Sequence, residues 1–109
     1  MCISFLLIKL KYMSLQQTWT RIKQQNPATP SDFMCLVFEC KPNITEHEII
    51  SWQRASHDWT TGIFDFVWFA FQVHKGHSEL IFRVEQMWPA IKSIIDEHSL
   101  EDLLASMSL

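Results

Sequence analysis

The chain has 109 residues, of which 48% are hydrophobic and 19% are charged, and its formal net charge is −3. This length suits one domain around a single hydrophobic core. The small negative charge, with nine Lys and Arg residues that form no cluster, argues against a nucleic-acid-binding protein. The apolar run at residues 2–8 is too short to span a bilayer, so we expect a soluble protein with no membrane partner.

The three cysteines are Cys2, Cys35 and Cys40, an odd number without the paired spacing of a disulfide framework or a structural zinc site. We expect them to be small buried hydrophobic groups in a reducing compartment, which indicates a cytoplasmic protein. The pattern predicts no metal site, no cofactor and no catalytic residue.

Residues 1–12 do not resemble a signal peptide, because Lys9 and Lys11 follow the apolar run instead of preceding it. Met13 is followed by Ser14 and then by Leu-Gln-Gln, which is a favourable helix start. Our hypothesis is that translation begins at Met13. Residues 1–12 would then be an N-terminal extension, and residues 13–109 a single helical domain.

Hydroxyl residues precede four periodic stretches, and each has an acid or an amide three residues later, as in an N-terminal capping box. These residues are Ser14, Thr29, Thr45 and Ser99. With only two glycines in the chain, they indicate an all-α bundle of about five to seven short helices. In chain order, the sequence predicts helices at residues 15–25, 30–40, 46–56, 62–75, 78–88, 89–98 and 100–107.

The first three helices have local start and stop signals. Leu15, Trp19 and Ile22 share one face of the first helix, and Asn26-Pro27 ends it. The second helix begins at Thr29-Pro30, with proline in the first turn. The third has Thr45 as its cap and a hydrophobic contact between Ile44 and Ile49 across the helix start.

Residues 63–73 are rich in β-forming side chains, so a strand competes with a helix there. The alternative fold is α+β, with a hairpin formed by residues 63–73 and 79–86. Asp65 and Gln72 are seven residues apart, which puts them on one stripe of a helix but on opposite faces of a strand. We therefore expect a central helix with Trp68 in the core, and a hinge at Gly76.

The last part of the chain is expected to form two helices, one beginning at Pro89 and one following Ser99. Residues 1–31 contain no acid, whereas the charged residues after Lys92 are all acidic. We expect these two ends of the chain to attract each other within the fold.

The string His74-Lys75-Gly76-His77 resembles the H-x-G-H motif of nucleotidyltransferases and class I aminoacyl-tRNA synthetases. The resemblance covers about residues 61–87, although eight residues separate Asp65 from His74 where the family has only a few. It implies a nucleotide site at His74, Gly76 and His77, with the histidines on phosphates. The other interpretation is that Lys75-Gly76 ends a helix, with Gly76 in a left-handed conformation.

Five tryptophans and eight phenylalanines exceed what a core of this size needs, and tryptophan is enriched at interfaces. Trp59, Phe69 and Trp88 are the candidate interface residues. The leading hypothesis is a small protein-binding module, such as an adaptor, assembly chaperone, inhibitor or immunity-type factor. A homodimer is the simplest form of it. The alternative is the nucleotide-binding protein, and we do not expect an enzyme.

Overall fold

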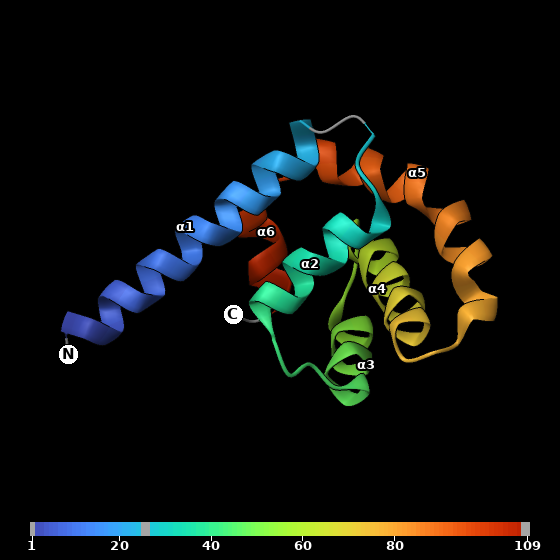
Figure 1. Ribbon diagram of the computed structural model, residues 1–109, viewed down its shortest axis with the longest axis horizontal. Coiled ribbons are helices and arrows are strands. Elements are labelled where there is room, and N and C mark those ends of the chain that lie inside the picture. The colour runs from blue at the N-terminus through green and yellow to red at the C-terminus, as the bar shows by residue number, and fades with distance from the viewer. Residues whose placement is uncertain (1, 25–26, 108–109) are drawn as a thin grey trace.

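The computed structural model describes residues 2–24 and 27–107, with the side chains of α1 described from Leu10 onward. Within these ranges the chain forms six α-helices, a 3-10 turn at Ser78–Leu80 and no strand (Figure 1). The helices are α1 (Cys2–Gln24), α2 (Pro30–Cys40), α3 (Glu46–Ala55), α4 (Thr60–His74), α5 (Ile81–Glu97) and α6 (Leu100–Ser106). The all-α prediction is confirmed, and the alternative hairpin at residues 63–73 and 79–86 is wrong.

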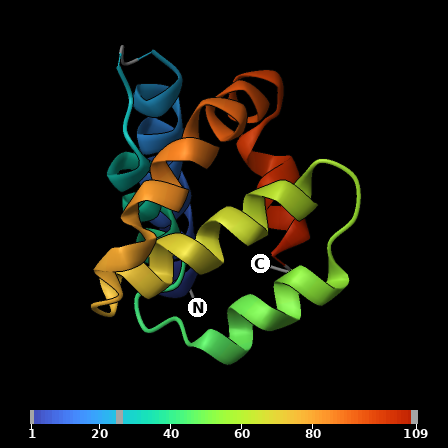
Figure 2. The same cartoon turned by 90° about the vertical axis from the view of Figure 1, so that its right-hand side faces the viewer.

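Helix α4 is the central element, in contact with α2, α3 and α5 (Figure 2). Burial explains why its β-forming residues adopt a helix: Ile63, Phe64, Phe66 and Val67 are each at most 1% exposed. A helix covered on several sides needs little polar surface, so its composition resembles that of a buried strand. Tertiary packing therefore overrides the local propensity.

Three of the four expected helix starts are capped as the sequence indicates. Thr29 and Asp32 form a reciprocal capping box at α2, in which the Asp32 carboxylate accepts the Thr29 N–H at 2.7 Å. Thr45 accepts the N–H of Glu48 at α3, and Ser99 accepts that of Asp102 at α6. Each bond satisfies one of the free N–H groups of a helix end.

The helix start predicted at Ser14 is wrong, because α1 begins at Cys2 and continues through Ser14 to Gln24. The sequence before Ser14 contains no proline, glycine or asparagine that would interrupt a helix, so α1 also includes the residues that precede Ser14. The carbonyl of Ser14 accepts the Thr18 hydroxyl at 3.1 Å. Translation from Met13 stays a prediction, and the stop signal at residues 25–26 lies outside the described residues.

The helix break predicted before Pro89 is also wrong, since α5 is one helix with Pro89 in its interior. An interior proline removes one backbone hydrogen bond and normally ends or kinks a helix. Here Val84, Ile91 and Ile95 lie in the core on both sides of Pro89, and this packing keeps the helix continuous. Helix α5 curves over the other helices (Figure 1).

Helix α1 contacts the end of α5 and the start of α6 through hydrogen bonds, and among the described side chains no ion pair joins these segments. Lys23 donates to the carbonyl of His98 at 3.1 Å, and the Tyr12 hydroxyl donates to the Glu101 carboxylate.

None of the described helices is both long enough and apolar enough to cross a bilayer. The first part of α1 extends beyond the other helices (Figure 1).

Candidate functional site

An apolar groove lies between α2 and α4, and Val84 of α5 also lines it. Its volume is about 450 Å³. The residues that line it come from all three helices: Pro30, Ser31, Met34, Cys35, Phe38, Ala70, Val73, His74 and Val84. Met34, Ala70 and Val84 belong to the hydrophobic core, and Phe38 and Val73 pack against it.

The floor of the groove is apolar, and its rim carries the polar groups. Met34, Ala70 and Val84 are 7–8% exposed, whereas Cys35 and His74 are exposed. The ring of Phe38 is half-buried and lies 4.9 Å from the imidazole of His74, centroid to centroid. The groove can therefore cover an apolar side chain while it offers a thiol and an imidazole at its edge.

The two described cysteines differ in their surroundings. Cys40 is buried, as the sequence predicts, and burial raises the pKa of its thiol to about 11. The prediction of burial is wrong for Cys35, which lies on the outer face of α2. Helix α2 directs Phe33, Leu36 and Val37 into the core, and this leaves Cys35 on the side that faces the groove.

The string His74-Lys75-Gly76-His77 forms the C-terminal cap of α4. Gly76 has a φ of +111°, and the N–H groups of Gly76 and His77 donate to the carbonyls of Val73 and Gln72. This is the Schellman arrangement, in which a residue with positive φ follows the helix end. The predicted helix end is confirmed.

Each of the three polar side chains of this cap contacts a different residue of the fold. His74 lies against Phe38, Lys75 donates to the Glu46 carboxylate, and His77 Nδ1 is 3.4 Å from a Glu79 oxygen. The segment that resembles nucleotidyltransferases, at about residues 61–87, forms most of α4, its cap and the first part of α5. A nucleotide site at His74, Gly76 and His77 stays a prediction.

The candidate interface residues Trp59, Phe69 and Trp88 are half-buried, and each has a partner within the chain. Trp59 stacks on His98, with ring centroids 4.0 Å apart and an interplanar angle of 15°. The guanidinium of Arg83 lies 5.0 Å from the Phe69 ring centroid. Their use in an interface stays a prediction.

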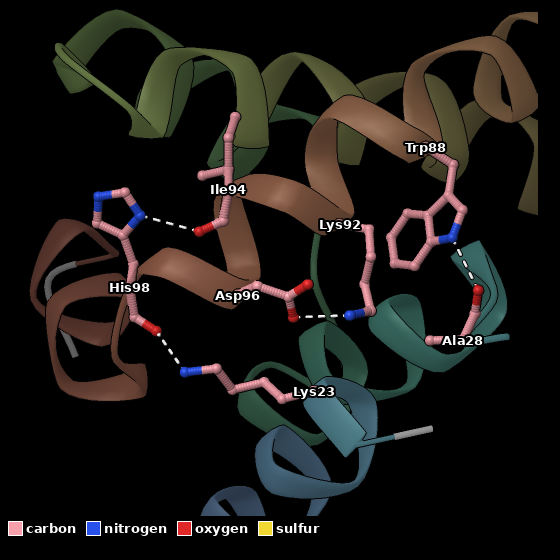
Figure 3. Close-up of polar contacts among 7 residues, drawn as sticks. All are labelled: Lys23, Ala28, Trp88, Lys92, Ile94, Asp96 and His98. Atoms are coloured by element: carbon pink, nitrogen blue, oxygen red, sulfur yellow. Dashed lines mark hydrogen bonds and ion pairs between the residues drawn. The ribbon is translucent and has the colours of Figure 1, made fainter. Parts of the chain in front are cut away.

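Separate polar contacts join α5 to its neighbours: Trp88 bonds to the segment before α2, and His98, at the end of α5, bonds to Lys23 of α1 (Figure 3). The Nε1 of Trp88 donates to the Ala28 carbonyl at 2.8 Å. Further along α5, Lys92 pairs with Asp96 at 2.6 Å, and His98 contacts the Ile94 carbonyl at 2.9 Å. The bond from Trp88 ties α5 to the segment before α2, whereas the two later bonds lie within α5 and at its C-terminal end.

Sequence reasoning missed the groove residues Met34, Phe38 and Ala70, and also Phe82, which is 68% exposed. A signal existed in α2, because apolar residues lie on two of its faces. One face supplies the core, and the second, with Met34 and Phe38 four residues apart, lines the groove.

Within residues 2–24 and 27–107, no three His, Cys, Asp or Glu side chains gather as they would around a metal ion. Comparisons of the chain with protein-family models, with curated proteins and with solved structures gave no match.

Proposed function

We propose that the protein is a protein-binding module and that the groove between α2 and α4 holds an apolar segment of its partner. The observation that carries this proposal is an open apolar groove on the outer side of the core. Phe33, Leu36 and Phe66 are 0% exposed in that core, whereas Met34 is 8% exposed in the groove and Phe38 is only half-buried there.

The dimensions and the lining support recognition of an amphipathic helix. A helix places apolar side chains on one face at intervals of three and four residues, and such helices commonly bind in apolar grooves. A groove of about 450 Å³ has room for two bulky side chains of this kind. Burial of that apolar surface supplies the binding free energy, and His74 at the rim offers a hydrogen bond for orientation.

Cys35 offers a direct test, because its exposed thiol lies in the groove. In a Cys2→Ser background, a thiol-reactive photo-crosslinker attaches to Cys35, since Cys40 is buried and its raised pKa disfavours the reactive thiolate. We expect irradiation in an extract of the cells that produce the protein to give a discrete adduct. The partner, identified by mass spectrometry and purified, is then expected to bind directly.

The matched control moves the crosslinker to another exposed position. In Cys2→Ser/Cys35→Ser/Ser93→Cys, the label lies nine residues beyond Val84, on the opposite face of α5. We expect the adduct to disappear. The same adducts from both positions, or a purified partner that does not bind, would contradict the proposal.

A further inference from the structure

The outer face of α1 is uncovered along most of the helix. Leu10 and Met13 are 53% and 56% exposed, and Gln17, Thr20 and Gln24 are also exposed. These five residues are spaced three and four apart, which is the seven-residue repeat of a coiled-coil seam. The opposite face of the helix is the buried one, with Leu15, Trp19 and Ile22 in the core.

The charges beside this face all have one sign. Arg21 and Lys23 flank the seam at the positions that face a partner's charged residues in a coiled coil, and in the sequence Lys9 has the same relation to Leu10. Helix α1 contains no acid. Lys11 and Lys23 donate to the carbonyls of Cys40 and His98, and among the described side chains neither they nor Arg21 make an ion pair with a carboxylate.

We infer that the outer face of α1 pairs with an acidic amphipathic helix of a partner protein. Glu or Asp residues beside the partner's apolar seam would face the basic residues of α1. A second copy of this chain is the less favourable occupant, because pairing α1 with α1 brings like charges together. This surface is separate from the groove, which α2, α4 and α5 form.

The surface of α1 has room for a partner's side chains. A shallow hollow of about 490 Å³ follows Gln16, Gln17, Thr20, Arg21 and Gln24. The Oε1 of Gln16 is shielded there and has no hydrogen-bond partner among the described residues. In the sequence, the apolar spacing continues from Leu10 to Leu6 and Ile3.

The test uses the full chain and two synthetic helical peptides of 22 residues as probes. Both carry Leu opposite the apolar part of the seam and Gln opposite its polar part, and they differ only in Glu or Lys at the flanking positions. We expect fluorescence anisotropy to show binding of the Glu peptide at least about tenfold tighter than that of the Lys peptide. Added salt should weaken the Glu peptide's binding.

Variants of the chain connect the binding to α1. Arg21→Glu and Met13→Glu should each weaken binding of the Glu peptide about tenfold or more. Ser93→Glu on α5 should leave that binding unchanged. All three positions are exposed, and circular dichroism checks that the variants stay folded. Equal binding of the two peptides, no binding of either, or self-association through α1 in sedimentation would overturn the inference. These measurements are independent of the groove, which lies on α2, α4 and α5, so the two proposals can fail separately.

Discussion

The indole Nε1 of Trp88 donates a hydrogen bond to the carbonyl oxygen of Ala28 at 2.8 Å, which ties the middle of α5 to the segment that leads into α2 (Figure 3). Trp88→Phe removes this donor but keeps an aromatic ring near Phe66. We expect the free energy of unfolding in urea to fall by about 1 kcal/mol, since the Ala28 carbonyl loses its partner. Trp59→Phe, which keeps a ring to stack on His98, should cost less; the opposite ranking would contradict the role of the bond.

The two glycines should respond to alanine with opposite signs. Gly62 lies inside α4, where a Cβ would meet Ile94 Cδ1 at 3.8 Å, an ordinary contact, so Gly62→Ala should stabilise the protein by about 0.5–1 kcal/mol. Gly76 has a φ of +111°, so Gly76→Ala should destabilise it by roughly 1–2 kcal/mol. Thermal unfolding of both variants measures the difference. Shifts of the melting temperature with the same sign would contradict either the helical conformation of Gly62 or the positive φ of Gly76.

The cap of α3 is the next test. Thr45 accepts the Glu48 N–H at 3.3 Å, and Thr45→Ala should cost about 1 kcal/mol of unfolding free energy in urea. Thr45→Ser keeps the hydroxyl and should restore most of the loss. If alanine and serine give the same stability, the helix does not depend on this cap.

Three surface carboxyls make stability depend on acid pH. Hydrogen bonds from Lys75, Lys41 and Tyr12 lower the pKa of Glu46, Glu48 and Glu101, respectively, below the usual 4.5. Because each pKa is lower in the folded state than in the unfolded chain, these contacts stabilise the protein fully at pH values above the usual pKa of 4.5. The stabilisation is lost as the pH falls through the folded-state pKa.

The urea midpoint should therefore decrease as the pH is lowered below about 4.5. Lys41→Met removes the ion pair with Glu48, which spans 3.1 Å, and should make this decrease smaller. A pH profile identical to that of the unaltered protein would rule out a contribution from Glu48.

Local signals in the sequence predicted much of the fold, because capping and helix termination depend on neighbouring residues. The caps at Thr29, Thr45 and Ser99 and the helix end at Gly76 are confirmed. Errors occurred where distant packing decides: the continuity of α5 through Pro89 depends on core contacts on both sides of it. The expectation that Trp68 belongs to the core is only partly right, since its ring packs against the core and is only partly buried.

The groove could not be predicted from the sequence, because it arises where α2, α4 and α5 meet. Met34 and Ala70 have the composition of ordinary core residues, and only the positions of the helices show that their outer sides face an open groove. Trp88, by contrast, packs against the core and is partly buried.

The binding role of the groove is tested most directly by filling it at Ala70, whose methyl group is part of the floor. Ala70→Leu adds three carbons inside the groove, and Ala90→Leu adds the same atoms at an exposed site on α5. Circular dichroism first checks that both variants stay folded, and titration calorimetry then measures their affinity for the partner identified through Cys35. We predict that folded Ala70→Leu loses binding by at least about tenfold, while Ala90→Leu binds as before. Undiminished binding by a folded Ala70→Leu would contradict the assignment of the groove as the binding site.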